Sequence, residues 1–345
     1  MKDSRTIVLA DHHKSVFVCT VVDRATGETR AATLESRPAS LKPFLESLPR
    51  PGLVFVEACR AWEWVADLCE ELGIELRLVD PSRMPEIARS HKKTDRHDVE
   101  AMLTRLLAVG RLPESYRASR AERELRSLTR RLSELRHDRR KTCYRIHALL
   151  DAAGLPAVKS RFTDTSWREE MSLALPAQRG FVLRTLLDQL DLLERLTEEI
   201  ETRLEELVGE RADVRRLQAI PGIGPVIAAT IVAEVADITR FPSARAFAAY
   251  TGLVPRVRSS AGEAHLGHIT RGGPPDLRWA LGQAAMVGLR AKVSTAASRL
   301  YRRKVKKGKR KKVALCAAAH KLARIVYVIL RREEVFRPAP PRRAA

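Results

Sequence analysis

The sequence predicts an α/β unit at residues 1–115, a helical middle at residues 116–210 and a mainly helical unit at residues 211–345. Three observations predict this order. Strand and helix signals alternate in the first part, heptad repeats fill the second, and a Gly-rich turn precedes an apolar helix in the third. The 345 residues leave room for two or three packed units, since domains usually hold ~100–200 residues.

The N-terminal unit begins with three strand-like segments, the second and third joined by a turn that contains Gly27. Strand and helix signals then alternate up to a helix that starts near Thr94. A meander of three strands followed by strand–helix units is the order of a ribonuclease-H-like sheet, which is the fold we expect. The expected strands are 5–10, 16–22, 29–34, 53–58 and 75–79, and the expected helices are 41–48, 62–72 and about 94–107.

Two heptad-like series occupy the middle region, separated by a connector that contains proline and tryptophan. This spacing is typical of helices that pack along a seam, although Arg139 and Thr142 interrupt the first series. We expect a coiled coil that makes the chain a homo-oligomer, a dimer or a tetramer. The alternative is an antiparallel helix pair within one subunit. The series are Leu125, Leu128, Leu132, Leu135, Arg139, Thr142, Ile146, Leu149 and Leu186, Leu190, Leu193, Thr197, Ile200, Leu204, Leu207.

The third unit opens with the segment Ile-Pro-Gly-Ile-Gly-Pro at residues 220–225, directly before an Ala- and Val-rich helix at 226–235. This pattern is typical of a helix-hairpin-helix turn. There Gly222 and Gly224 would let backbone N–H groups approach a phosphate, next to the positive end of a helix. Many tight turns between helices share the pattern, so an ordinary turn is the alternative.

The charge of the chain indicates a polyanionic partner. Lys and Arg number 63 against 42 Asp and Glu, which gives +21 and a pI near 10.4. Phosphate contacts release condensed counterions, so such a surplus favours DNA or RNA. Nine of the twelve residues at 301–312 are basic and an apolar helix follows, so we expect nucleic-acid contact there and not only a solvated tail. The residues concerned are Lys306, Lys307, Lys309, Arg310, Lys311 and Lys312.

Membrane and disulfide signals are weak. We find no run of 18 or more apolar residues and expect no membrane partner. The five cysteines form no C-x-x-C pair, which argues against a zinc knuckle or a disulfide framework. We therefore expect a cytoplasmic protein.

Four carboxylates in the N-terminal unit are candidate metal ligands. Asp11 ends the first strand, Glu57 interrupts an apolar strand, and Asp95 and Asp98 lie three apart at the start of a helix. Phosphodiester chemistry with two Mg²⁺ ions needs three or four carboxylates that converge from different elements. Each has a structural alternative, as a strand end, an exposed strand residue or a helix cap. A carboxylate within an apolar strand needs a partner, which favours the metal site.

Two serines lie in a Gly- and Arg-rich loop of the C-terminal unit. Ser259 and Ser260 are near Arg256, Arg258 and Arg271. A serine hydroxyl among guanidinium groups could attack a phosphodiester, and the arginines would stabilise the developing charge. A flexible loop without catalytic role is the alternative, and composition alone does not decide between them.

These segments together resemble the DEDD transposases of the insertion sequence 110 family, which are guided by a bridge RNA and are related to the Piv invertases. The resemblance covers nearly the whole chain. The motifs that carry it are Leu-Ala-Asp-His-His-Lys at 9–14, Val-Phe-Val-Glu-Ala at 54–58, Lys-Thr-Asp-Arg-His-Asp at 93–98, the 220–225 turn, Tyr-Thr-Gly-Leu-Val-Pro at 250–255, Ser260, Gly272-Gly273 and Leu277-Arg278.

The resemblance implies a RuvC-like catalytic domain, a coiled coil and a transposase domain with a serine nucleophile. It implies that Asp11, Glu57, Asp95 and Asp98 bind Mg²⁺, and that Ser260 forms a transient covalent link to DNA. Such proteins act as oligomers on donor and target DNA chosen by a structured non-coding RNA. The resemblance also implies a prokaryotic protein that is associated with the nucleoid. The family's serine is commonly followed by Gly, whereas Ala261 follows it here, so Ser259 remains an alternative.

Two other functions are compatible with the residues. A structure-selective nuclease, such as a junction resolvase, would use the same four carboxylates and form no covalent intermediate. A non-catalytic nucleic-acid-binding scaffold would use neither the carboxylates nor the serine. Of the three functions, we expect the one that the resemblance implies, a recombinase that cuts and rejoins DNA.

Overall fold

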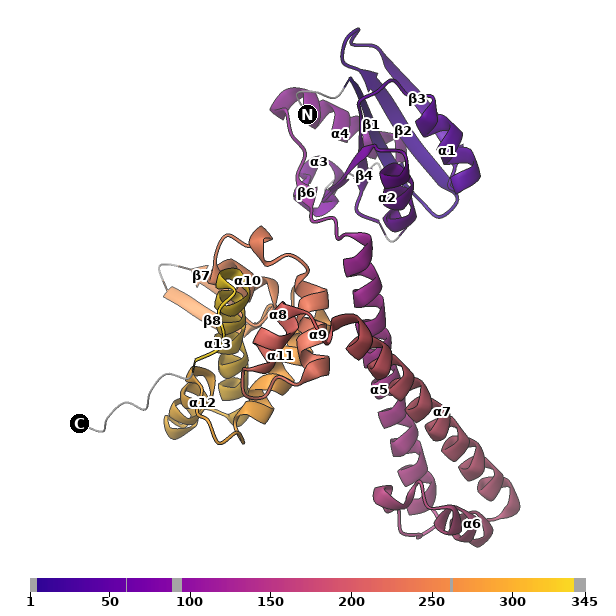
Figure 1. The fold of residues 1–345 in the computed structure, drawn as a ribbon, viewed down its shortest axis with the longest axis vertical. Coiled ribbons are helices and arrows are strands. Elements are labelled where there is room, and N and C mark those ends of the chain that lie inside the picture. Colours follow the sequence, from indigo (N-terminus) through magenta and orange to yellow (C-terminus); the bar gives the residue numbers. More distant parts are fainter. Residues whose placement is uncertain (1–4, 60, 89–94, 261–262, 338–345) are drawn as a thin grey trace, which may run out of the picture. The chain divides into compact units, whose positions relative to one another are not determined.

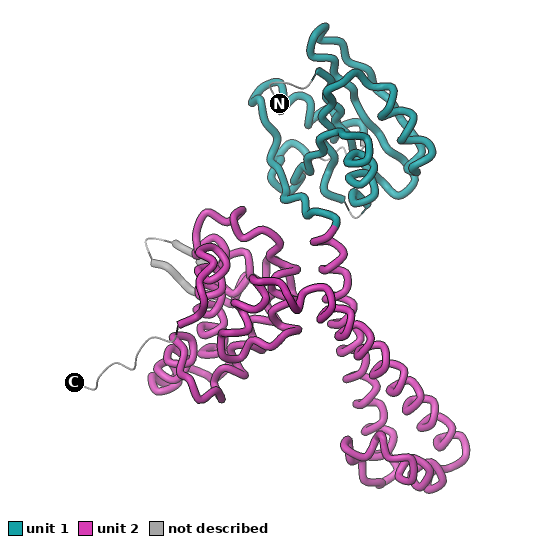
Figure 2. The backbone as a smooth tube through the Cα atoms, viewed as in Figure 1, with its two compact units in different colours: residues 1–120 teal, residues 121–345 magenta. Residues whose placement is uncertain are grey.

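The computed structural model describes residues 5–59, 61–88, 95–260 and 263–337. Contacts within the chain divide it into two compact units, residues 1–120 and residues 121–345 (Figure 2). Each unit is described by itself below. The further separation of a helical middle domain from a C-terminal domain stays a prediction.

Unit 1 holds a mixed six-stranded sheet, which agrees with the expected ribonuclease-H-like class. The strand order is β3-β2-β1-β4-β5-β6. β1, β2 and β3 form the antiparallel meander, β4 and β5 run parallel to β1, and β6 is antiparallel to β5. The strands are β1 (Thr6–His12), β2 (Val16–Asp23), β3 (Thr29–Glu35), β4 (Gly52–Glu57), β5 (Glu75–Val79) and β6 (Glu114–Ser115).

Helices cover both faces of this sheet (Figure 1), and the alternation of strand side chains decides what each face meets. Val8 and Ala10 of β1 belong to the apolar cluster that includes α1 and α2. Ile7 and Leu9 belong to a second cluster on the side of α3 and α4. The central strands are therefore apolar on both faces. The helices are α1 (Pro38–Glu46), α2 (Trp62–Glu71), α3 (Pro85–Ala88) and α4 (Asp95–Val109).

The heptad series of unit 2 form two long helices, α5 (Arg120–Asp151) and α7 (Ala177–Val208). Their cross-contacts run in opposite directions along the chain, so the helices are antiparallel. The polar pairs are Arg136 with Glu201 at 2.7 Å, Arg139 with Glu194 at 2.9 Å and Thr142 with Gln189 at 3.4 Å. The two residues that interrupt the first leucine series thus bond polar partners on the facing helix.

The connector between α5 and α7 folds into a further helix, α6 (Thr165–Ala174), which the sequence did not predict. Trp167 of α6 is fully buried and packs on Phe162 at the end of the helix pair. The pairing of α5 with α7 occurs within one chain. An intersubunit coiled coil stays a prediction.

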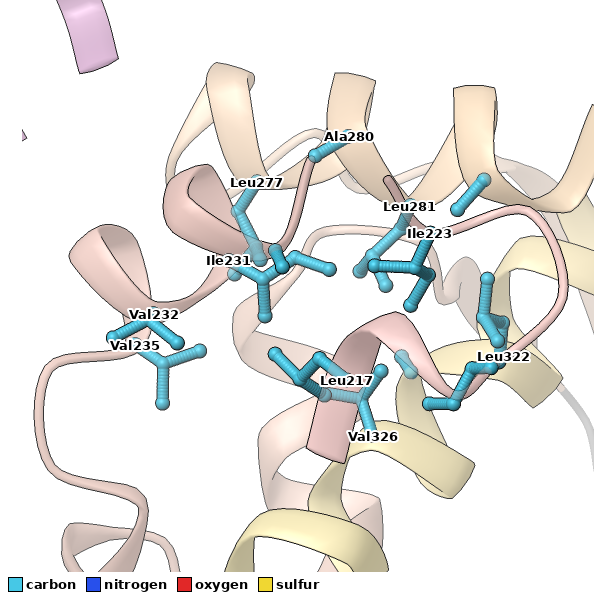
Figure 3. Close-up of a cluster of buried hydrophobic side chains, with 14 of the residues drawn as sticks. Leu217, Ile223, Ile231, Val232, Val235, Leu277, Ala280, Leu281, Leu322 and Val326 are labelled. Carbon is cyan, nitrogen blue, oxygen red and sulfur yellow. The ribbon is translucent and has the colours of Figure 1, made fainter. Parts of the chain in front are cut away.

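The rest of unit 2 is mainly helical, as expected, and is built around one apolar cluster (Figure 3). Leu217, Ile231, Leu281 and Leu322 meet there from four different helices. The elements are α8 (Ala212–Gln218), α9 (Pro225–Val235), α10 (Ala244–Tyr250), β7 (Pro255–Ser260), β8 (Glu263–Ile269), α11 (Pro275–Gly288), α12 (Ala296–Lys306) and α13 (Lys311–Arg332).

A buried ion pair joins α5 to this cluster. The carboxylate of Glu234 in α9 is almost completely buried and accepts two hydrogen bonds from the guanidinium of Arg130, at 2.8 and 3.1 Å. Arg126 lies 3.8 Å from the same carboxylate. Because a buried charge needs compensation, these two arginines hold α5 on α9.

The sequence expectation that no segment could span a membrane needs correction for α13. By length and composition alone this helix could cross a bilayer. In the fold, however, Ala318, Leu322 and Val326 are buried in the unit 2 cluster, and α13 packs on α10, α11 and α12. Its apolar character therefore reflects a core position in the unit.

Candidate active site

Three of the four predicted carboxylates converge at one edge of the sheet in unit 1. Asp11 lies near the end of β1, Glu57 ends β4, and Asp98 lies in the first turn of α4. β1 and β4 are parallel neighbours, with Ala10 opposite Val56, so their carboxyl ends meet at the same edge. One oxygen from each carboxylate lies within 4.8 Å of the other two.

The strand alternation directs these side chains to the α4 face. Asp11 follows Leu9 by two residues and Glu57 follows Phe55 by two, and both apolar residues pack in the cluster of α4. A period of two keeps residues on one face of a strand. Asp11 is 2 % exposed, whereas Glu57 and Asp98 are half-buried. The site is therefore open on one side, as a substrate phosphate requires.

Burial and mutual repulsion both weaken the acidity of Glu57. The pKa of its carboxyl group is raised from 4.5 to about 7, first by burial and then by the negative charges of Asp11 and Asp98. His13 acts in the opposite direction. Two carboxylates that face each other in this way favour a shared cation or a shared proton.

Two histidines next to Asp11 have contacts that the sequence analysis did not predict. His13 Nε2 donates a hydrogen bond to Asp11 Oδ2 at 3.0 Å. His12 is buried on the opposite face of the sheet, where its ring contacts Phe17 and Trp64. Burial, and then the charge of His13, lower the pKa of His12. The sequence signal that could have indicated these contacts is the pair of histidines at the end of an apolar strand.

The fourth predicted ligand, Asp95, begins α4 three residues before Asp98. Residues three apart lie on the same side of a helix. The side chain of Asp95 lies outside the described residues, so its role as a ligand stays a prediction.

The donor set fits a hard divalent cation. Asp11, Glu57 and Asp98 present only carboxylate oxygens, which Mg²⁺ prefers, and within the described part of the chain no cysteine or histidine is grouped with them as a ligand. A soft-metal site would need thiolate or imidazole groups. The clustering is compatible with Mg²⁺, and the number of ions stays a prediction.

Ser259 and Ser260 lie at the end of β7 in the hairpin β7–β8, where the backbone of Ser260 pairs with that of Glu263. The side chains of Ser259, Ser260 and Arg258 and the turn at 261–262 lie outside the described residues. Arg256 and Arg271, at the base of the hairpin, are exposed. The predicted nucleophile and the guanidinium groups are thus carried by one hairpin.

The base of this hairpin is fixed by close backbone packing. Gly252 and Gly273 have φ values of +70° and +78°, and a side chain on Gly273 would collide with the carbonyl oxygen of Tyr250. Thr270 N–H donates to Val254 O at 2.8 Å, and Arg278 donates to backbone carbonyls after β8. The hairpin therefore starts from a rigid platform on α10 and α11.

The 220–225 turn connects α8 to α9. Gly222 has φ +98°, and a Cβ there would collide with the backbone of α11. This close approach explains that glycine by packing. Gly224 is the exposed N-cap of α9, with open space around it and Pro225 as the first helical residue. Phosphate binding at Gly222 and Gly224 stays a prediction.

The predicted basic segment spans the end of α12, a turn at Gly308 and the start of α13. All six of its predicted contact residues are exposed, and none forms an ion pair with a carboxylate among the residues that the structure describes. They are Lys306, Lys307, Lys309, Arg310, Lys311 and Lys312. Their charges are available to a polyanion.

Comparison with known proteins agrees with both halves of the chain. A family model described as "Transposase IS116/IS110/IS902 family" matches residues 214–302. A second model, described as "Transposase" and built on DEDD enzymes of IS110, matches residues 10–154. The two matches include the carboxylate site of unit 1 and the hairpin of unit 2.

Full-length relatives have the same character. A "Probable family 20 transposase" of Pseudomonas aeruginosa is 33 % identical, over 95 % of this chain and 97 % of its own. The transposase for insertion sequence element IS1328 of Yersinia enterocolitica is 30 % identical, over 86 % of this chain and 88 % of its own. The transposase for insertion sequence element IS1111A of Coxiella burnetii is 28 % identical, over 98 % and 92 %.

Two family models that together match most of the chain, and a relative 33 % identical over 95 % of it, lead to one assignment. The chain belongs to the IS110 family of transposases, which are enzymes that cleave DNA and transfer its strands.

Proposed function

We propose that this transposase cleaves DNA with Mg²⁺ held by Asp11, Glu57 and Asp98, with Asp95 as a further ligand, and with Ser260 as the nucleophile. The observation that carries the proposal is the convergence of three carboxylates from β1, β4 and α4 within 4.8 Å. Such a set costs free energy without a cation, as the raised pKa of Glu57 indicates. A metal ion compensates the three charges.

When bound, Mg²⁺ polarises the scissile phosphate and stabilises the leaving oxygen. The roles of the protein residues follow from their positions. Asp11 and Glu57 stand on rigid neighbouring strands and fix the ligand geometry. His13 holds one oxygen of Asp11 and so orients the carboxylate, as is usual around metal-binding carboxylates.

The proposed covalent step uses the hydroxyl of Ser260. Its oxygen attacks the phosphorus, a phosphoserine diester bond forms, and the bond to the leaving strand breaks. The serine hydroxyl gives up its proton, and the leaving oxygen takes up a proton and becomes a free hydroxyl, so that the proton count is unchanged. Attack by a strand hydroxyl on the phosphoserine reverses these events and rejoins DNA. Arg256 and Arg271 carry the charge that would stabilise the phosphorane.

The carboxylate and serine roles are separable by experiment. Asp11→Ala and Asp98→Ala should bind DNA and fail to cleave it. Ser260→Ala should lose the denaturant-resistant protein–DNA adduct, while the matched variant Ser259→Ala keeps it. An adduct lost only in Ser259→Ala would move the nucleophile to that residue. Cleavage without any adduct would indicate water attack, as in a structure-selective nuclease. An absence of cleavage under all metal conditions would leave a binding scaffold.

We further propose that a structured non-coding RNA selects the DNA sites. The net charge of +21 and the exposed basic segment at 306–312 support a polyanion of this kind. RNA that co-purifies with the protein should be sequenced and should contain hairpin loops complementary to the element's ends. Nuclease-treated protein that recombines DNA as fast as untreated protein would contradict the guide.

The proposed active form is a homo-oligomer, a dimer or a tetramer. Leu192 and Leu207 on α7 are nearly half exposed, which leaves apolar surface on the helix pair for a second copy. Sedimentation analysis should give a mass that is a multiple of 38.7 kDa. Substitution of both leucines by glutamate should reduce it to one chain.

A further inference from the structure

A pocket of about 710 Å³ lies in unit 2, and none of its described lining residues belongs to the hairpin that carries Ser260. Its wall is one face of α13, together with the first residues of α10 and α12 and the segment 334–337 that follows α13. Every residue that lines it belongs to unit 2. None of them is among the residues to which the proposed function assigns a role.

The floor of the pocket is apolar. Ile325, Val328 and Ile329 are contributed by α13, and Val335 and Phe336 by the segment after it. Ile325, Val328 and Phe336 are half-buried and pack on the unit 2 cluster. Their accessible surface is therefore turned to the pocket on a rigid support.

The rim is cationic. Arg299 comes from α12, Lys321 and Arg324 from α13, and Arg337 from the following segment. Among the residues that the structure describes, none of these four forms an ion pair with a carboxylate. Glu334, the only acidic residue among the described residues of the lining, lies 3.8 Å from Arg332, which does not line the pocket.

The positive field of the rim reaches a neighbouring histidine. Burial, and then the charges of Arg324 and Lys321, lower the pKa of His320. Unit 2 thus keeps several cations close together next to an apolar surface. This arrangement suits a ligand that has both anionic groups and a flat apolar body.

We propose that this pocket binds a nucleotide of single-stranded nucleic acid, with the phosphates on the cationic rim and the base on the floor beside Phe336. The proposal rests on the proposed function, because it takes the ligand from the nucleic acids on which a transposase acts. Single strands expose base faces for aromatic contact and present phosphates to arginine and lysine. Base pairs in a duplex hide these faces, so the pocket selects single-stranded segments.

The test measures the binding of a fluorescently labelled oligothymidylate to the full chain by fluorescence anisotropy, at several salt concentrations. Phe336→Ala should weaken binding about tenfold, since each stacked base contributes ~1–3 kcal/mol. Arg324→Ala should also weaken it and should lower the slope of log Kd against log salt by about 0.7, the value for one phosphate of a single strand. Arg324 is exposed, so its loss should leave the melting temperature unchanged.

Arg331→Ala is the matched control, because Arg331 is an exposed arginine of the same helix that does not line the pocket. It should bind the oligothymidylate like the wild type. Duplex DNA should bind equally to the wild type and to Phe336→Ala. Thymidine monophosphate should compete better than inorganic phosphate, which separates a nucleotide from a free anion.

Equal affinities for Phe336→Ala, Arg324→Ala and Arg331→Ala would overturn the inference. A loss in Arg324→Ala alone would also overturn it, because the site would then bind a phosphate without a base. These outcomes concern binding only. The proposed function fails on different readouts, namely cleavage by Asp11→Ala or an adduct in Ser260→Ala.

Discussion

Replacement of Glu57 by glutamine should stabilise the metal-free protein above neutral pH. In the fold the pKa of Glu57 is raised from 4.5 to about 7. Below the lower value the carboxyl group is protonated in both folded and unfolded chains, so it has no effect on the pH dependence. Between the two values only the unfolded chain releases the proton, and stability falls as pH rises. Above a pH of about 7 the carboxyl group is ionised in both states, and the loss of folding stability caused by its charge no longer changes with pH. This constant loss is the penalty of the buried charge.

The size of this penalty follows from the difference between 4.5 and about 7. It corresponds to about 3 kcal/mol if fully expressed, at 1.36 kcal/mol for each pH unit. Glu57 is only half-buried, and solvent screening reduces the penalty to about 1–2 kcal/mol. Glutamine has nearly the same shape without the charge. We therefore expect a gain of about 1–2 kcal/mol, or a few degrees in melting temperature.

The assay is thermal unfolding followed by circular dichroism, with chelator and then with Mg²⁺. With chelator at pH of about 8, Glu57→Gln should melt above the wild type, and near pH 4 the two should coincide. Mg²⁺ should raise the wild-type melting temperature more than that of the variant, because the cation loses one charged ligand. If Mg²⁺ stabilises both proteins equally, Glu57 is no ligand. If the variant gains nothing at alkaline pH, neither burial nor the neighbouring carboxylates raise the pKa of Glu57.

Three further predictions concern the remaining structure. Arg130→Ala should destabilise unit 2 by about 3–5 kcal/mol in urea unfolding, because the buried Glu234 carboxylate keeps only Arg126, at longer range. A loss below 1 kcal/mol would mean that Arg126 alone compensates the charge of Glu234. Gly273→Ala should lower both stability and adduct yield, because its Cβ collides with Tyr250 O. The control Gly308→Ala has a similar φ of +76° but lies in open space, and it should lower the free energy of unfolding by only ~1 kcal/mol. Equal losses of stability in the two variants would contradict the packing argument. Trp167→Ala should remove about 3–5 kcal/mol from the end of the helix pair, measured as above, and an unchanged midpoint would show that α6 contributes nothing.

Much of unit 1 was predictable because its signals are local. Strand β5 was expected at 75–79 and is Glu75–Val79, and the turn around Gly27 lies between β2 and β3. Alternating apolar residues and turn residues act over a few positions, so a sequence displays them directly. The meeting of Asp11 with Glu57 also follows from pattern, because both lie at the carboxyl ends of strands that are apolar on both faces.

What the sequence did not predict depends on distant partners. Strand β6 has two residues and exists only because it pairs with β5. The packing of Gly222 comes from α11, about sixty residues further along the chain. Helix α6 is stabilised by Trp167 in a cluster that draws on α5 and α7. Such contacts have no local periodicity.

The alternation along β1 makes the number of residues in that strand as important as their identity. A deletion of one residue upstream of Asp11 would turn every later side chain to the other face of the sheet. The aspartate would then point to the apolar face on which Phe17 and Trp64 contact His12, and a histidine would enter the carboxylate cluster. This part of an insertion sequence should therefore tolerate conservative replacements readily, but it should almost never tolerate in-frame insertions or deletions. The position of Asp11 within the alternation of β1 is therefore constrained as strongly as the aspartate itself.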